Sequence, residues 1–78
     1  MRIRVRFFAV LREQQRRSEA EIDVAPGTCA AEVYAQLFPA GPDGGLPVMY
    51  AVNDAYVPPE YRLIAGDELA FIPPLGGG

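Results

Sequence analysis

The last six residues of the sequence, Pro-Pro-Leu-Gly-Gly-Gly at 73–78, are of types that suit chemistry at a chain end. Glycines carry no Cβ, so the final carbonyls can be approached from either face and can enter a channel too narrow for side chains. Pro73 and Pro74 favour an extended backbone, which reduces the entropy lost when the segment threads into another protein. The extended segment spans at most about 20 Å at roughly 3.3–3.6 Å per residue. We therefore expect a flexible tail that can present the carboxylate of Gly78 inside a neighbouring protein.

The carboxylate at the end of this tail is a poor electrophile, because its leaving group would be hydroxide-like. Adenylation would give the acyl carbon a good leaving group, and a nucleophile could then attack it. An inert, frayed chain end is the alternative explanation, since that is the common fate of terminal glycines. The residues of 73–78 alone leave both explanations open.

Composition narrows the function classes. The 78 residues suffice for one domain, and half of them are hydrophobic, which indicates a globular chain rather than a disordered one. The net charge of −3 argues against nucleic acid as the main partner, because phosphate binding needs a clustered excess of basic residues. The chain has no histidine, so it lacks the usual general base near neutral pH and any His-based metal site. We expect no metal site.

The predicted cellular compartment rests on three features that the sequence lacks: a pair of cysteines, a long apolar run and a signal peptide. The single cysteine cannot form an internal disulfide, which fits a reducing environment. No apolar run approaches the roughly 20 residues needed to cross a bilayer, and the first residues alternate with arginine instead of forming a signal peptide. We therefore expect a cytoplasmic chain without membrane contact.

Hydrophobic periodicity predicts an α+β domain over residues 1–72, followed by the tail at 73–78. Residues 9–17 read as a turn or short helical connection, and 39–47 as a loop rich in glycine and proline. One amphipathic helix, with apolar residues at helical spacing between Ala30 and Phe38, ends at Pro39. Alternation of apolar and polar residues predicts a mixed sheet of about five strands, at 2–8, 19–24, 48–53, 55–57 and 68–72.

The first two strands carry opposite charges on their outward faces. Arginines occupy alternate positions of 2–6, and acidic residues occupy alternate positions of 19–23. Pairing these strands in a hairpin would set the two rows side by side, each cross-strand pair contributing about 0.2–1 kcal/mol. The basic row is therefore interpreted as a solvated, salt-bridged face.

The start of the predicted helix contains two residues of interest. Thr28 is expected to be the N-cap, because its hydroxyl can accept a hydrogen bond from a free backbone N–H. With that cap, Glu32 lies one position too far along for a capping box. Cys29 would then be the first helical residue, where the helix dipole can favour a thiolate that could hold a persulfide. A buried structural cysteine is the alternative, and we expect this thiol to have no chemical role.

Apolar side chains at outward positions raise the question of a partner surface. Phe8 lies on the arginine side of its strand, Ile72 lies opposite the inward Phe71, and Tyr56 sits on the short edge strand. A cluster of such residues would mark a partner surface, whereas single exposed apolar residues are common. The pattern alone leaves open whether the three share one patch.

These stretches together resemble a known family. The sequence RIRVRFFAVLRE at the start, AVN at 51–53 and LIAGDELAFIPPLGGG at the end are similar to the small subunit of molybdopterin synthase, a ubiquitin-like sulfur carrier, over the whole chain. A terminal Gly-Gly alone would be a weak signal, but the two long stretches together are specific. The resemblance implies the β-grasp fold.

The resemblance also implies an activity without a bound cofactor. An activating adenylyltransferase would use ATP to adenylate Gly78, and a sulfur donor would displace AMP to leave a thiocarboxylate. The carrier would be a non-catalytic subunit that docks on the large synthase subunit, as a heterotetramer, and donates sulfur for the molybdopterin dithiolene. The residues implied to insert with the tail are Pro73, Pro74, Leu75, Gly76 and Gly77.

Four matching positions are implied to contact these partners: Phe8, Arg12, Tyr56 and Ile72. Tyr56 stands where relatives usually have leucine, and Gly76 stands where they have a variable small residue. Arg12 could instead be merely solvated. The alternative functions are a related sulfur carrier for thiazole, a tungsten cofactor or transfer RNA, a protein modifier, and an interaction domain with an inert tail.

Overall fold

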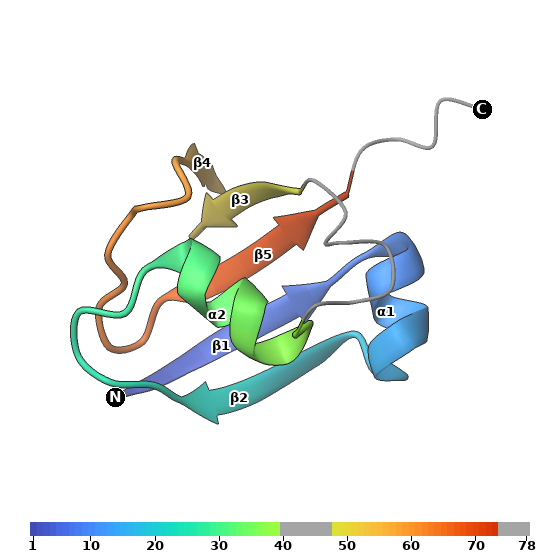
Figure 1. Ribbon diagram of the computed structural model, residues 1–78, viewed down its shortest axis with the longest axis horizontal. Coiled ribbons are helices and arrows are strands. Elements are labelled where there is room, and N and C mark those ends of the chain that lie inside the picture. The colour runs from blue at the N-terminus through green and yellow to red at the C-terminus, as the bar shows by residue number, and fades with distance from the viewer. Residues whose placement is uncertain (40–47, 74–78) are drawn as a thin grey trace.

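The computed structural model describes residues 1–39 and 48–73, which form a mixed five-stranded sheet with helix α2 across one face (Figure 1). The elements, in chain order, are β1 (Arg2–Phe7), α1 (Ala9–Gln15), β2 (Glu19–Asp23), α2 (Ala30–Leu37), β3 (Met49–Val52), β4 (Ala55–Val57) and β5 (Glu68–Ile72). The strand order is β2-β1-β5-β3-β4. This confirms the predicted element order, and α1 is the short helical connection expected at 9–17.

The first and last strands lie side by side at the centre of the sheet. β1 and β5 pair in parallel, with Phe7 opposite Phe71, and all other neighbours pair antiparallel. Both central strands therefore end at the same edge of the sheet, next to α1 (Figure 1). No helix among residues 1–39 and 48–73 is long and apolar enough to span a membrane.

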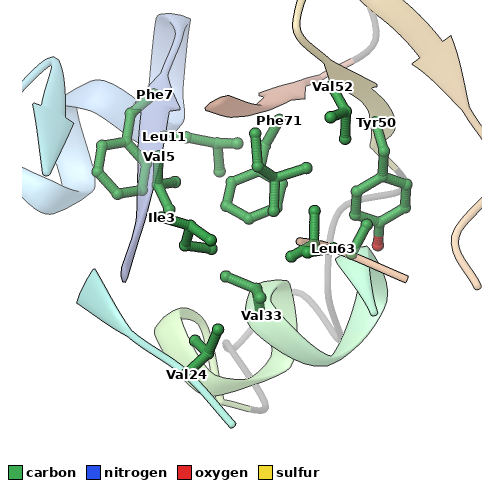
Figure 2. Close-up of a cluster of buried hydrophobic side chains, with 12 residues drawn as sticks. Ile3, Val5, Phe7, Leu11, Val24, Val33, Tyr50, Val52, Leu63 and Phe71 are labelled. Atoms are coloured by element: carbon green, nitrogen blue, oxygen red, sulfur yellow. The ribbon is translucent and has the colours of Figure 1, made fainter. Parts of the chain in front are cut away.

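The core fills the space between the sheet and α2. Phe71 is fully buried, and its ring lies within 5.1–6.3 Å of four other aromatic rings, centroid to centroid. Figure 2 shows Phe71 at the middle of the cluster, with side chains of β1 on one side and those of β3 on the other. The inward positions predicted from alternation are confirmed for Leu69 and Phe71 in β5 and for Ile3, Val5 and Phe7 in β1.

The predicted charge ladder is also confirmed. Arg2 faces Asp23, Arg4 faces Glu21 and Arg6 faces Glu19 in the register of β1 and β2. The shortest ion pair joins Arg2 Nε to Asp23 Oδ1 at 3.0 Å. The side chains of the ion pairs that join Arg2 and Arg4 to β2 are 48–70% exposed, so each of these pairs adds little to stability.

The start of α2 differs from the prediction. Cys29, not Thr28, is the N-cap, and the Thr28 hydroxyl donates a hydrogen bond to the Ala25 carbonyl at 2.6 Å. Thr28 therefore closes the preceding turn instead of capping the helix. With the cap moved by one residue, Glu32 reaches the N3 position, and its carboxylate accepts the Cys29 N–H at 2.9 Å. The capping box that the sequence argued against is present.

A polar network ties the β3–β4 hairpin to the turn before β5. The Asn53 side chain donates to Asp67 Oδ1 at 3.1 Å and accepts the Glu68 N–H at 3.0 Å. The second oxygen of Asp67, a residue only 3% exposed, accepts the Ile64 N–H at 2.9 Å. The motifs AVN and GDE therefore have a structural role, because their polar side chains join two turns that are distant in sequence.

Candidate functional site

The parallel pairing of β1 and β5 brings two of the predicted partner residues together. Phe8 directly follows β1 with extended backbone angles, so the alternation of the strand continues through it. Ile72 is the last residue of β5, and Phe7 pairs with Phe71 immediately before. Because Phe7 and Phe71 point into the core, Phe8 and Ile72 lie on the face of the sheet away from α2.

Tyr56 completes a shared surface on that face. Phe8, Tyr56 and Ile72 line one hollow of about 200 Å³, together with Arg6, Ala51, Asp54, Glu68 and Ala70. Phe8 is 36% exposed and Tyr56 is 67% exposed, so both rings are open to a partner. The three outward residues therefore share one patch, and we call this surface the apolar hollow.

The middle of the apolar hollow is lined by small side chains. Ala70 of β5 pairs with Ala51 of β3, and Ala51 pairs in turn with Tyr56 of β4. Two alanines between larger rings leave space that an apolar side chain of a partner can fill. An occupant of this kind would be held mainly by burial of apolar area, at about 25 cal/mol per Å².

Charged groups border the apolar hollow. The Arg6 guanidinium lies over the Phe8 ring, 5.2 Å from its centroid, and its Nη1 is 3.9 Å from Glu68 Oε1. Arg6 is thus held between an aromatic face and a carboxylate. The hollow combines an apolar centre with a polar rim, which is the usual composition of a protein–protein contact.

Sequence reasoning missed one residue beside this surface. Met49 is 55% exposed and pairs directly with Ile72 across β3 and β5. The signal was present in the alternation of β3, where the inward Tyr50 requires an outward Met49. The register that sets Met49 beside Ile72 could not be read from the sequence.

Arg12 does not line the apolar hollow. It is exposed on α1, one helical turn beyond Phe8, and its N–H bonds to the Phe8 carbonyl at 3.4 Å. Ile72 is the last residue of β5 and lines the apolar hollow, so the chain leaves the sheet beside the hollow. Pro73, the next residue, is buried. The predictions for Pro74, Leu75, Gly76, Gly77 and Gly78 fall outside the described residues and stay predictions.

Cys29 is not the first helical residue, as the sequence predicted, but the N-cap of α2. It is half-buried, forms an isolated β-bridge with Arg62 and does not line the apolar hollow. Within residues 1–39 and 48–73, no group of three or more His, Cys, Asp or Glu side chains is placed to hold a metal ion.

Comparison with known proteins agrees with this geometry. A curated relative from Chlamydomonas reinhardtii, the molybdopterin synthase sulfur carrier subunit, is 36% identical over 83 residues and is matched over 100% of both chains. The crystal structure of small archaeal modifier protein 1 from Haloferax volcanii has 25% identity and a TM-score of 0.79, covering 95% of this chain and 98% of that one.

A third likeness concerns the fold alone. In the complex of subunits 1 and 2 of the molybdopterin-converting factor from Helicobacter pylori, one chain matches with 23% identity and a TM-score of 0.65 over 100% of both chains. These structures confirm the ubiquitin-like β-grasp fold that the resemblance implied. The ThiS family profile matches residues 5–78. Since that match covers nearly the whole sequence, the chain belongs to the ThiS family.

Proposed function

We propose that this chain is the sulfur carrier subunit of a molybdopterin synthase and that it carries sulfur on the carboxylate of Gly78. The full-length relative of that name supports the role. The geometric observation that carries the proposal is the apolar hollow of Phe8, Tyr56 and Ile72, because it lies where the chain leaves β5 toward the tail. A partner seated on the hollow would have the tail within reach of its own interior.

The chemistry proposed for the tail has two stages. An adenylyltransferase first joins the Gly78 carboxylate to the α-phosphorus of ATP, and pyrophosphate leaves. Hydrosulfide from a sulfur donor then attacks the acyl carbon, the acyl–oxygen bond to AMP breaks, AMP and a proton leave, and a thiocarboxylate remains. The carrier supplies no catalytic side chain in either stage and acts as a non-catalytic subunit working in the cytoplasm.

The same surface serves the next step of the proposal. The carrier docks through the apolar hollow on the large synthase subunit, and the tail from Pro73 to Gly78 enters that subunit's active site. The thiocarboxylate sulfur bonds to a carbon of the cyclic pyranopterin precursor, and water then cleaves the acyl–sulfur bond, which restores the Gly78 carboxylate and leaves the sulfur on the pterin. Because each carrier brings one sulfur atom, a dithiolene requires two deliveries, which fits a heterotetramer with two carriers.

Mass spectrometry tests the first stage directly. The chain co-produced with its activating enzyme is expected to gain the mass of one oxygen-to-sulfur exchange, confined to Gly78. A variant lacking Gly78 and a variant with alanine appended after it are the matched controls, and neither should support dithiolene formation. Undiminished dithiolene formation by the extended variant would refute the proposal.

A protein modifier is the second candidate, favoured by the structural likeness to small archaeal modifier protein 1. Both functions would begin with the same activation, so the thiocarboxylate alone does not separate them. Purified chain, activating enzyme and large subunit should convert the pterin precursor if the first function holds. Isopeptide-linked conjugates of Gly78 without any pterin conversion would favour the modifier instead.

A further inference from the structure

The described arginines fall into two groups. Arg2, Arg4 and Arg6 each have a carboxylate within 4.0 Å, and Arg62 donates to the Gly27 carbonyl at 2.8 Å. For the remaining three, the described residues contain no carboxylate within salt-bridge distance: Arg12, Arg16 and Arg17. All three come from α1 or the two residues that follow it, and we call them the basic strip.

Arg16 occupies a backbone conformation that costs stability. It is the C-cap of α1 with φ of 58° and ψ of 32°, in the left-handed region that favours glycine. The turn around it is hydrogen-bonded, with the Arg17 N–H bonding to the Arg12 carbonyl at 3.3 Å. Glycine would satisfy this helix end better than arginine, by about 1 kcal/mol. Arg16 therefore stands at a position where glycine would suit the backbone better.

The basic strip is next to the proposed docking surface. Arg12 follows Phe8 by one helical turn, and Arg16 follows Arg12 by another. Figure 1 places α1 at the sheet edge where β1 and β5 end. Arg17 also has a packing contact, with its guanidinium 5.9 Å from the Phe7 ring centroid. Exposed positive charge thus extends from Arg12, one turn beyond Phe8, along the end of α1. Glu13 is the one carboxylate within α1, and the Arg17 guanidinium lies toward the core-facing ring of Phe7.

We infer that Arg16 and Arg17 extend the docking surface beyond Arg12, so that the basic strip binds an acidic segment of the protein that receives the tail. The inference rests on the proposed function. Charge complementarity identifies the occupant as a run of Asp and Glu side chains on a protein. A nucleic acid is disfavoured because three exposed arginines stand on a chain whose net charge is −3. Long-range attraction of this kind acts mainly on the association rate.

The substitution Arg16→Gly separates docking from stability. The glycine relieves the left-handed backbone, so the urea midpoint of unfolding should rise, while association with the large subunit or the activating enzyme should slow by about twofold. Arg16→Glu should slow association by about fivefold or more at low salt, and the loss should shrink as salt rises. Arg62→Glu is the control, since it makes the same charge change in the segment between β4 and β5, at the opposite end of the molecule from α1 (Figure 1).

Equal association rates for Arg16→Glu and Arg62→Glu, with normal binding by the unchanged chain, would overturn the inference but leave the proposed function standing. Failure of the unchanged chain to bind either protein would sink the proposed function. In that event an NMR titration with a ten-residue polyglutamate peptide still tests the strip. Larger shifts at the side-chain Nε–H groups of Arg12, Arg16 and Arg17 than at those of Arg2, Arg4 and Arg6 support it. Equal shifts, or tighter binding of a single-stranded RNA oligomer than of the peptide, contradict it.

Discussion

Asn53 shows how much one side chain can fix in this small domain. Its backbone is left-handed, with φ of 50°, and its amide joins Asp67 and the Glu68 N–H. Asn53→Ala should remove both hydrogen bonds and place alanine in a left-handed conformation that it tolerates less well, which should lower the free energy of unfolding by about 2 kcal/mol. Asn53→Gly keeps the conformation and should cost about half as much. Urea unfolding of both variants measures the difference, and equal losses would show that the hydrogen bonds alone matter.

Cys29 is expected to act through its position as N-cap and not through sulfur chemistry. Serine is a stronger cap than most residues, so Cys29→Ser should hold or raise the unfolding midpoint, while Cys29→Ala should lower stability by about 0.5–1 kcal/mol. Neither substitution should change thiocarboxylate formation at Gly78. Loss of sulfur transfer in a folded Cys29→Ala variant would establish a persulfide role.

The choice between Thr28 and Cys29 as cap could not have been made from the sequence. Threonine is the better capping residue, but its hydroxyl is turned toward the Ala25 carbonyl, to which it donates a hydrogen bond. The Ala30 N–H bonds to the Tyr61 carbonyl, a contact with a segment about thirty residues away that fixes where the helix begins. The hydrogen bond from Ala30 to the distant Tyr61 therefore outweighs the local preference for threonine at the N-cap.

At the scale of elements, the β1–β2 hairpin gives a pH prediction. Hydrogen bonding and attraction from Arg2 lower the pKa of Asp23 below its ordinary value of 3.8. A lowered folded-state pKa means that the contribution is fully present above 3.8 and is lost as pH falls through the folded value. Arg2→Gln should raise the pKa of Asp23, as followed by carboxyl carbon NMR. An unchanged titration would show that the ion pair does not persist in solution.

The strands and helices were largely predictable from the sequence, but which strands pair with one another was not. Alternation gave the inward faces of β1 and β5, because a period of two is a local property. The parallel pairing of β1 with β5 is not local, yet it alone brings Phe8 to Ile72. The sequence could therefore predict Phe8, Tyr56 and Ile72 as outward residues, but it could not predict that they line one hollow.

At the scale of the whole molecule, we expect substitutions in the core to change stability and substitutions in the apolar hollow to change partner binding. Phe71→Ala empties the centre of the aromatic cluster and should lower the free energy of unfolding by about 3–5 kcal/mol. That is a large share of the roughly 5–15 kcal/mol by which a typical domain is stable. Phe8→Ala removes an exposed ring and should change stability by less than about 1 kcal/mol, yet weaken binding of the large subunit about tenfold or more. Calorimetry and titration of both variants check this. A Phe8→Ala chain that unfolds as readily as Phe71→Ala would place Phe8 in the core.

The central place of β5 bears on how the protein is made. β1 is translated about sixty residues before β5, its parallel neighbour, so the two strands cannot pair until synthesis has passed residue 72. A product of premature termination before residue 68 would lack the middle of its sheet and would be exposed to proteases. Such truncated copies would thus be degraded before they could occupy a binding partner of the complete sheet.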